Sequence, residues 1–512
     1  MRGLAPEFSP YRWAATTDEV AARAGIDPSQ VIRFDQNTPP LPLPTTRPGT
    51  VAGALARLNA YPGSGYGPLA RAIAEYAGVD PANVVLGAGA DDLILLCARS
   101  FAGPGDVVAI PPAPTYPLFR IAAQLAGSQV TDSDADGAAV SFACRPNNPT
   151  GELGTLADVR PLVVDEAYFE YCGETALPLI DEGVVVLRTF SKAFALAGAR
   201  IGYALASPDV AEELNARQAP APVSGVSVAL ALAALAAPPD VAPVLEERER
   251  LASALRALGL APLPSHANFV YVPVEDGLAL GDALLRHGFV VRAYESAIRI
   301  SVLDREDDDV LVETLARVLD RPSSVAAAGG RRVRRLRATA ETRIAVRLAL
   351  DGASRVRIST GAGIYDHFLE QLAFHGGLDL VLEGAGDLET GDHHTAEDAA
   401  LALGEALDAA LADRRGIARY GDAVVPMDDA VARAAVDLGG RPHAELKIEP
   451  EPGMAQHFFG SLAQAGRLAV HVEASGRDAH HTAEAAYKAV GRALRTALRQ
   501  ESAGIPSTKG VL

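Results

Sequence analysis

Cysteines and long apolar runs are scarce in this chain. Only three cysteines occur among its 512 residues: Cys97, Cys144 and Cys172. They lack the spacing of metal ligands and are too few for a disulfide framework, so we expect a reducing, cytoplasmic compartment. No run of about 18 apolar residues is present, and we therefore expect no membrane-spanning helix. The first ten residues have no apolar core and do not predict a secretory signal.

Net positive charge is also lacking. The formal net charge is −18, so nucleic acid is not expected to be the main partner. Small phosphorylated molecules are not excluded, because a few arginines and backbone amides are enough to bind them. The hydrophobic fraction of 49% and the charged fraction of 21% are those of an ordinary soluble protein. The length predicts about three domains.

A change of composition near residue 330 divides the chain. Proline, serine, alanine and glycine at 322–330 precede the arginine-rich stretch Arg331–Arg337. Small flexible residues followed by charge are typical of a linker. We therefore predict a first domain over 1–325, a linker over 326–336 and a second domain over 337–512. The arginines are expected to lie in a solvated linker or to alternate along a first strand, rather than to bind nucleic acid.

Apolar patterns predict different architectures on the two sides of the linker. Before it, short apolar runs at Val107–Ile110, Leu162–Val164 and Val184–Leu187 alternate with helical segments, which indicates an α/β domain with a buried parallel sheet. After it, Arg343–Leu350 alternates between polar and apolar residues, which predicts a half-buried strand. We expect an α+β fold for this second domain.

The pentapeptide His-His-Thr-Ala-Glu occurs twice, at His393–Glu397 and at His480–Glu484. Matching small and apolar residues follow both copies, so we predict two fused repeats over about 337–425 and 426–512. On a helix the first His and the Glu share a face, while the second His points about 100° away. One further His precedes each copy, at His367 and His457.

These side chains form a predicted set of metal ligands. The set is His367, His393, His394, Glu397, His457, His480, His481 and Glu484. Imidazole and carboxylate ligands that leave positions open are typical of manganese or iron rather than of a closed structural zinc site. A non-catalytic metal-binding assembly module is the alternative to an enzyme.

Three segments of the first domain contain the residue types of a cofactor site. They are Pro146–Gly151, Val163–Tyr168 and Arg188–Gly202. From about Gln36 to Leu303 the chain resembles the fold-type I aminotransferases that use pyridoxal phosphate (PLP), above all histidinol-phosphate aminotransferase. The resemblance implies a large lobe, a small lobe and a dimer. Only 13 residues occupy 151–163, where these enzymes carry an additional helix and strand, and the loop at 132–136 is also short.

The resemblance implies a role for each residue of this site. Lys192 would form a Schiff base with PLP and move the α-proton, while Asp165 would keep the pyridine nitrogen protonated. Ring contacts are implied for Tyr116, Asn148 and Tyr168, and phosphate contacts for Ala90, Asp91, Thr189, Ser191, Arg200 and, from the neighbouring subunit, Tyr61. Arg299 and Arg292 would bind the anionic substrate, unless they are ordinary strand arginines.

From about Arg337 to Leu512 the chain resembles imidazoleglycerol-phosphate dehydratase. The resemblance is carried by Thr360–His367, Gly386–Leu388, Asp392–Asp398, Arg419–Gly421, Pro426–Asp429, Gly440–Pro442, His457–Phe459, His480–Glu484 and Pro506–Gly510. It implies two Mn²⁺ ions per site and a large cage of subunits. Glu484 or Glu341 would remove the proton from C2 of the substrate. Phosphate contacts are implied for Arg419, Arg441, Ser507 and Lys509, and hydroxyl contacts for His375, whereas His443 and His471 are expected to be structural.

Together the resemblances predict two consecutive steps of histidine biosynthesis. The second domain would convert imidazoleglycerol phosphate to imidazole-acetol phosphate, and the first would transaminate that ketone with glutamate, giving histidinol phosphate and 2-oxoglutarate. The partners would be these small molecules and further copies of the chain. An aromatic aminotransferase or a phosphothreonine decarboxylase is the alternative for the first domain.

Overall fold

The computed structural model describes residues 8–11, 14–26, 28–39, 53–63, 66–132, 137–322, 331–351, 355–450, 454–501 and 504–507. The chain divides into two compact units, the first from residues 1–25 and 31–328 and the second from 26–30 and 329–512. Among the described residues, no helix is long and apolar enough to cross a membrane.

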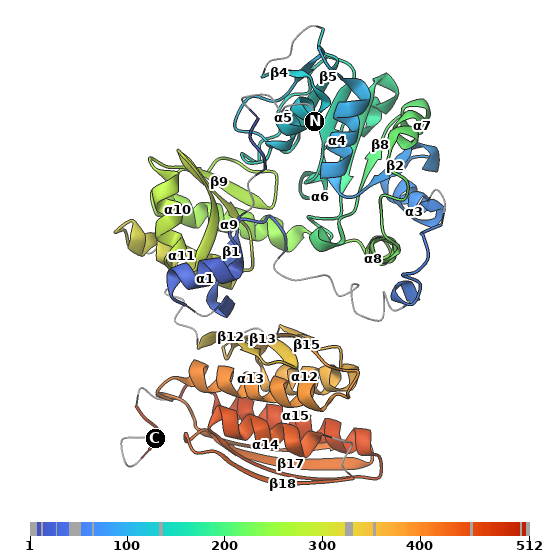
Figure 1. Ribbon diagram of the computed structural model, residues 1–512. Coiled ribbons are helices and arrows are strands. Elements are labelled where there is room, and N and C mark those ends of the chain that lie inside the picture. The colour runs from blue at the N-terminus through green and yellow to red at the C-terminus, as the bar shows by residue number, and fades with distance from the viewer. Residues whose placement is uncertain are drawn as a thin grey trace. The chain divides into compact units, whose positions relative to one another are not determined.

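A seven-stranded sheet forms the large lobe of the first unit (Figure 1). Its order is β2-β8-β7-β6-β5-β3-β4, with β8 antiparallel to both neighbours and the other pairs parallel. The strands are β2 (Val84–Gly87), β3 (Val107–Ala109), β4 (Gln129–Thr131), β5 (Val140–Cys144), β6 (Leu162–Asp165), β7 (Val184–Thr189) and β8 (Gly202–Leu205). The three short buried strands expected from the sequence are confirmed as β3, β6 and β7.

Helices cover both faces of this sheet. The helices α4 (Ala90–Phe101), α5 (Leu118–Ala126) and α7 (Pro208–Arg217) share a core with one face, and α3 (Gly67–Ala77) and α8 (Gly225–Leu235) share a core with the other. Neighbouring residues of a strand point to opposite faces. Val163 of β6 therefore joins the first core, while Leu162 and Val164 join the second. Burial on both faces explains why these strands are continuous apolar runs.

The small lobe contains a four-stranded sheet of order β1-β10-β11-β9. Its strands are β1 (Ile32–Phe34), β9 (Phe269–Pro273), β10 (Phe289–Tyr294) and β11 (Ala297–Ser301). The helices α9 (Ala242–Ala257), α10 (Gly277–Leu285) and α11 (Arg305–Val318) share its apolar core. The short helices α1 (Thr17–Ala24) and α6 (Phe169–Cys172) complete the helices of this unit that Figure 1 labels.

The strands β5 and β6 are joined without a crossover helix. Parallel neighbours are usually connected through a helix, but residues 145–161 contain neither helix nor strand. Leu156 of this segment packs against the second core instead. The short connection confirms the shortening that the sequence predicts between Thr150 and Val164. Of the short loop at 132–136, residues 133–136 lie outside the described part of the chain.

The second unit contains two four-stranded sheets with the same topology. The first has the order β12-β13-β15-β14 and the second β16-β17-β19-β18; in each, the last two strands are parallel and the other pairs antiparallel. The strands are β12 (Arg332–Ala338), β13 (Thr342–Ala349), β14 (Val356–Ser359), β15 (Asp379–Gly386), β16 (Tyr420–Met427), β17 (Ala430–Asp437), β18 (His443–Glu449) and β19 (Ala469–Ser475). The half-buried strand expected at Arg343–Leu350 is confirmed as β13.

Four helices lie between these two sheets (Figure 1). They are α12 (Gly363–Gly376), α13 (His393–Leu411), α14 (Ala455–Gly466) and α15 (Ala479–Ala497). The helix α13 packs on α14, and α15 packs on α12, so each helix pair joins the two halves of the unit. The two helices expected to begin at the His-His motifs are confirmed as α13 and α15.

The predicted linker over 326–336 extends too far. Residues 323–330 lie outside the described part of the chain, but Arg332–Ala338 form β12, paired with β13 along its whole length. The arginines thus belong to a first strand, which was one of the two expected alternatives. Because β12 is an edge strand, alternate arginines can keep their guanidinium groups in solvent without disrupting the sheet.

Two glycines bring the paired helices close together, and their substitution tests this packing. A Cβ at Gly404 would lie 2.8 Å from the Ala465 Cβ, and one at Gly491 would lie 2.5 Å from the Leu372 carbonyl oxygen. We expect Gly404→Ala and Gly491→Ala each to lower the free energy of unfolding by about 1–3 kcal/mol, because overpacking forces the helices apart. Urea unfolding followed by circular dichroism measures this.

The control is Gly460→Ala in α14, where a Cβ would meet no atom within 4 Å. This substitution should be neutral or stabilise the protein by up to about 1 kcal/mol, since alanine favours the helix. If all three variants behaved alike, close approach at Gly404 and Gly491 would not determine the helix spacing.

Candidate functional sites

A cavity of about 1010 Å³ lies between the large and small lobes of the first unit. Ten of the eleven residues expected to bind the cofactor line it: Ala90, Asp91, Tyr116, Asn148, Asp165, Tyr168, Thr189, Ser191, Lys192 and Arg200. Tyr61 does not line it, and 89% of this side chain is exposed. Its expected contact involves a second subunit and stays a prediction.

The sheet explains why these residues meet. Asp165 ends β6, Thr189 ends β7, and Asn148 follows β5 after a short turn. Because β5, β6 and β7 are parallel, their carboxyl ends share one edge of the sheet. The segments that are far apart in sequence therefore place their polar side chains in one cavity.

Asp165 is a buried carboxylate, and few interactions stabilise its charge. Its side chain accepts a hydrogen bond from the Ala167 N–H at 3.1 Å. Burial raises the pKa of Asp165 to about 7, and that hydrogen bond opposes the shift. A positive ring nitrogen next to this carboxylate would favour its charged form. The position therefore fits a protonated pyridine.

Lys192 points its amine into the same cavity. The Nζ atom donates a hydrogen bond to the Gln36 carbonyl oxygen at 3.3 Å and lies 5.7 Å from the centroid of the Tyr168 ring. Burial, followed by repulsion from Arg299, lowers the pKa of Lys192 to about 8. A substantial neutral fraction near neutrality suits an amine that must attack an aldehyde. Lys192 is also the only lysine in residues 1–446.

Two asparagines connect the ring-binding residues to the small lobe. Asn37 donates a hydrogen bond to the Tyr168 hydroxyl oxygen at 3.0 Å, and its backbone N–H donates to the Ser301 hydroxyl at 2.8 Å. Asn148 accepts a hydrogen bond from Arg299 at 2.5 Å. Asn37 was not expected from the sequence, since it follows β1 outside any of the motifs.

The amino end of α4 forms a cradle for an anion. Gly202 of β8 has no side chain, and a Cβ there would lie 2.9 Å from the Ala90 backbone nitrogen. Arg200 reaches this end, where it donates to Asp91 at 3.0 Å. The Thr189 hydroxyl donates to the Ser191 hydroxyl at 2.9 Å. Backbone amides at a helix start, together with a cation and hydroxyl groups, are the usual components of a phosphate site.

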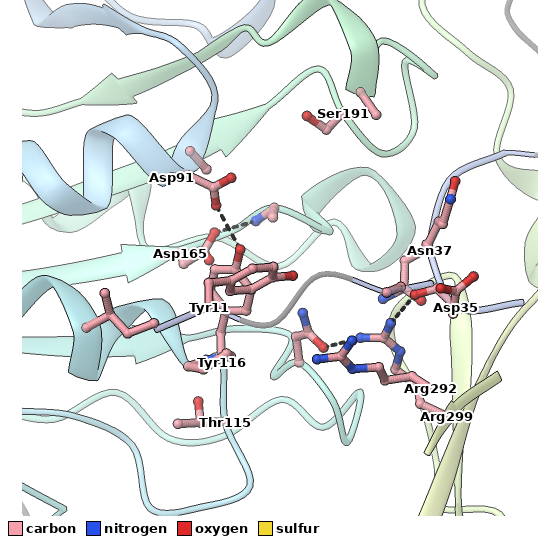
Figure 2. A pocket seen from close by; sticks show the side chains of 18 of the residues that line it. Tyr11, Asp35, Asn37, Asp91, Thr115, Tyr116, Asp165, Ser191, Arg292 and Arg299 are labelled. Carbon is pink, nitrogen blue, oxygen red and sulfur yellow. Dashed lines mark hydrogen bonds between the residues drawn. The ribbon is translucent and has the colours of Figure 1, made fainter. Parts of the chain in front are cut away.

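Arg292 and Arg299 lie on neighbouring strands at directly opposed positions. Opposed residues of an antiparallel pair point to the same face, so both side chains reach the cavity. Figure 2 shows the two arginines side by side near Asp35, on the side away from Asp91 and Ser191. An anionic group of a substrate could therefore be held apart from the α4 cradle.

The predicted metal ligands of the second unit form two clusters. In the first, Glu484 Oε2 lies 3.6 Å from His367 Nε2 and 3.4 Å from His480 Nε2. In the second, Glu397 Oε2 lies 3.6 Å from His393 Nε2 and 3.3 Å from His457 Nε2. Each cluster therefore combines two imidazoles with one carboxylate.

Each cluster draws ligands from both halves of the unit. The His-x-x-x-Glu pair on α15 meets His367 of α12, whereas the pair on α13 meets His457 of α14. The sequence predicts the ligands but not this exchange. The middle of each motif faces inward: Thr395 and Thr482 are fully buried, as are the alanines that follow them. Helical geometry therefore separates the packing residues of the pentapeptide from its ligands.

His394 and His481 join neither cluster. The Nδ1 atom of His394 lies 3.0 Å from Asp387 Oδ2 and 3.6 Å from Glu341. The Nδ1 atom of His481 lies 2.6 Å from Asp429 Oδ1. These hydrogen bonds raise the pKa of both imidazoles. The predicted set of eight ligands is therefore divided into two groups of three and two outlying histidines.

Lys488 was missed in the sequence but contacts the first cluster. Its Nζ lies 2.7 Å from Glu484 Oε1, one turn further along α15. The corresponding position of α13 is Leu401, so the second cluster lacks this cation. A lysine four residues after the glutamate is the only signal for it, and such pairs are common on helix surfaces.

The remaining predicted site residues of the second unit are distributed over several elements. His375 on α12 is half-buried, and burial followed by repulsion from Lys488 lowers its pKa. Arg419 forms a paired contact with Asp437, at 2.7 and 3.1 Å, and donates to the Pro506 carbonyl at 3.0 Å, next to the half-buried Ser507.

Arg441 is exposed, and Lys509 lies outside the described residues. His443 and His471 form a ring contact of 5.4 Å on β18 and β19. Among the described residues, neither belongs to a group of three ligands, in agreement with the structural role expected for both.

Comparison with known families matches both units. Residues 29–315 match the family model described as aminotransferase class I and II, and residues 360–494 match imidazoleglycerol-phosphate dehydratase. The solved structure of histidinol-phosphate aminotransferase from Sinorhizobium meliloti, in complex with pyridoxal-5'-phosphate, has a TM-score of 0.53 and 27% identity. The match covers 62% of this chain and 98% of the chain in that structure. The first unit thus resembles the PLP-dependent aminotransferase fold.

Two relatives resemble the second unit. The imidazoleglycerol-phosphate dehydratase of Methanothermobacter thermautotrophicus is 47% identical over 190 residues, which is 36% of this chain and 98% of that protein. The dehydratase of Phytophthora nicotianae is 50% identical over 186 residues, which is 34% of this chain but only 41% of that longer protein.

The electrostatics of the cavity predict how the Lys192 amine titrates. Arg299 lowers its pKa by repulsion, so Arg299→Leu should move the pKa of Lys192 upward from about 8, while burial keeps it below the ordinary value. The pH dependence of acetylation of the Lys192 peptide, followed by mass spectrometry in cofactor-free protein, measures this. Arg292→Leu, which is not among the causes of the shift, should leave it unchanged. An unchanged or lower pKa in Arg299→Leu would contradict the repulsion.

Proposed function

We propose that the chain is a bifunctional enzyme of histidine biosynthesis. It belongs to the class I and II aminotransferases through its first unit and to the imidazoleglycerol-phosphate dehydratases through its second. The second unit dehydrates imidazoleglycerol phosphate to imidazole-acetol phosphate. The first unit transaminates that ketone with glutamate, which yields histidinol phosphate and 2-oxoglutarate. One chain thus performs two consecutive reactions.

The observation that carries this proposal is the presence of both sites in one chain. The cavity with Asp165 and Lys192 has the donors that PLP requires, while the two clusters of histidine and glutamate supply the nitrogen and oxygen ligands that Mn²⁺ accepts. The product of one reaction is a ketone, and a ketone is the acceptor that an aminotransferase consumes.

The residues of the first unit fit PLP. The α4 cradle, Ser191 and Arg200 would hold its phosphate, and Asp165 would hold its ring nitrogen. When bound, PLP supplies a conjugated ring that takes up the electron pair left by removal of the α-proton. Lys192 moves that proton at the α-carbon, while Arg299 and Arg292 bind the anionic ends of the substrates.

The residues of the second unit fit two divalent ions. Each cluster offers three ligand atoms within 4.8 Å of one another, fewer than an octahedral ion requires. We propose that His394 and His481 complete these sites between subunits. When bound, the ions supply positive charge to the two nitrogens of the substrate's imidazole.

A carboxylate must remove the C2 proton of the substrate, and the geometry favours Glu341. Glu484 is held by two imidazoles and by Lys488, whereas the Glu341 side chain is 54% exposed and lies 3.6 Å from His394. Glu341 is therefore free to take a proton, while Glu484 acts as a ligand. Arg419, Arg441, Ser507 and Lys509 bind the phosphate, and His375 contacts a hydroxyl group.

The architecture of the chain supports two further proposals. We propose that the second unit arose by duplication, with repeats over about 337–425 and 426–512, which the matching order of its two sheets supports. We also propose functional domains over 1–325 and from Arg332 onward. The chain would form a homo-oligomer in which Tyr61 serves the PLP phosphate of a neighbouring subunit.

A coupled assay tests the function. Imidazoleglycerol phosphate, glutamate, PLP and Mn²⁺ should yield histidinol phosphate with the unaltered chain. Lys192→Ala should accumulate imidazole-acetol phosphate at the unaltered rate, because only the lysine that carries PLP is lost. It should also lose the visible absorbance of enzyme-bound PLP. After borohydride reduction, the unaltered protein should carry its PLP label on Lys192.

Two results would contradict this assignment. A PLP absorbance band retained by Lys192→Ala would remove the lysine from the site. Transamination of other keto acids at a higher rate than of imidazole-acetol phosphate would place the first unit among broader aminotransferases.

The metal clusters predict a different set of defects. His457→Gln and His367→Gln should each lower Mn²⁺ content and the dehydration rate by more than about tenfold, because losses even of residues that support a ligand cost 10–100-fold. Transamination should not change. His471→Gln should retain its Mn²⁺, because this residue lies in no cluster. Loss of metal in His471→Gln but not in His457→Gln would overturn the ligand assignment.

A further inference from the structure

The two histidines outside the clusters share one unexplained feature. Each presents its Nδ1 atom to a nearby aspartate: His394 to Asp387 at 3.0 Å, with Glu341 further away at 3.6 Å, and His481 to Asp429 at 2.6 Å. In the clusters, by contrast, the carboxylate lies next to Nε2. The second His of each motif therefore has a different partner at a different nitrogen.

The two carboxylates do not correspond in the sequence. Asp387 follows β15, just before the helix that carries His394, whereas Asp429 lies in the turn between β16 and β17. Asp387 lies seven positions before His394, but the residue seven positions before His481 is Ala474. The residue that corresponds to Asp429 by position is Glu341, in the turn before β13, and it lies 3.6 Å from His394 Nδ1. The shortest contact to the second His therefore comes from different elements in the two halves.

We propose that Asp387 and Asp429 are positioning residues that keep the proton of His394 and His481 on Nδ1 and leave each Nε2 as a metal donor. An ionised carboxylate can only accept a hydrogen bond, so the imidazole must donate from Nδ1. In the neutral imidazole the free lone pair then lies on Nε2, which is the atom a metal ion can bind. This inference rests on the metal sites of the proposed function.

Both carboxylates are held in place by further hydrogen bonds. Asp429 Oδ2 accepts hydrogen bonds from the backbone N–H groups of Arg477 at 2.6 Å and Asp478 at 3.0 Å. Asp387 Oδ2 accepts from the Thr390 hydroxyl at 2.8 Å. A carboxylate fixed in this way also fixes the orientation of the ring that donates to it.

The anchoring of Asp429 makes Asp429→Asn an informative change. The amide oxygen would keep the two backbone N–H groups, so the amide NH₂ would face His481 Nδ1. Two donors cannot form a hydrogen bond, and the imidazole would therefore move its proton to Nε2. The ring would remain in place, but its lone pair would no longer face the ion.

The test is the affinity of the full-length protein for Mn²⁺, measured from free Mn²⁺ by electron paramagnetic resonance. We expect Asp429→Asn and Asp387→Asn to weaken Mn²⁺ binding by about 10–100-fold, as supporting residues of metal ligands generally do. Asp422→Asn is the control, because Asp422 is an exposed aspartate of β16, the strand that precedes the turn with Asp429. It should leave the affinity unchanged.

A double-mutant cycle separates positioning from a structural role. In a His481→Gln background, Asp429→Asn should cause no further loss of Mn²⁺ affinity, because it acts only through His481. Additive losses, or unaltered affinity in both Asp→Asn single variants, would overturn the inference. If the unaltered chain bound no Mn²⁺, the metal sites of the proposed function would fall as well, so the two failures are distinguishable.

Discussion

Close packing of helix backbones at Gly404 and Gly491 is the constraint on which the second unit depends. At these two points α13 approaches α14, and α15 approaches α12, more closely than a Cβ atom would permit. The same crossings bring His457 to the ligands of α13 and His367 to those of α15. Neither α13 nor α15 alone provides more than one imidazole and one carboxylate on a face. The two clusters of histidine and glutamate and the helix packing are therefore two consequences of the same contacts.

The first unit depends on the shared edge of its parallel strands. Strands buried on both faces are mainly apolar, so most of their polar residues lie near the strand ends. That requirement places Asp165, Thr189 and the turn with Asn148 at one edge of the sheet, whatever their separation in sequence. Loss of the crossover helix between β5 and β6 does not disturb this edge, because the segment 145–161 still returns the chain to a parallel neighbouring strand.

Much of both candidate sites could be predicted from the sequence because short-range motifs carry the proposed metal ligands and the proposed PLP lysine. The repeated pentapeptide predicts two helices with ligands on one face, and both helices are present. The exchange of ligands between halves could not be predicted, since it depends on which helices pack together. Asn37 and Lys488 were missed for a similar reason: an isolated asparagine or lysine is common on surfaces, and only its neighbours in space indicate a role. Asp387 and Asp429 lie in motifs that carry the resemblance, but the sequence does not show which histidines they face. The predicted linker over 326–336 is too long, because the arginine-rich edge strand β12 resembles a solvated segment in the sequence.

The cavity of the first unit contains a carboxylate whose charge the surrounding residues stabilise only in part. Asp165 is buried with a raised pKa, whereas Glu397 is half-buried beside two imidazoles. Burial of a poorly compensated charge costs stability, so the empty cavity is less favourable than one that holds a cation. A ring cation next to Asp165 would remove part of that cost. The chain with such a ligand bound should therefore be the more stable form. The acidic composition is consistent with this arrangement, because cationic groups are supplied locally, by single residues and by ligands, rather than by the surface as a whole.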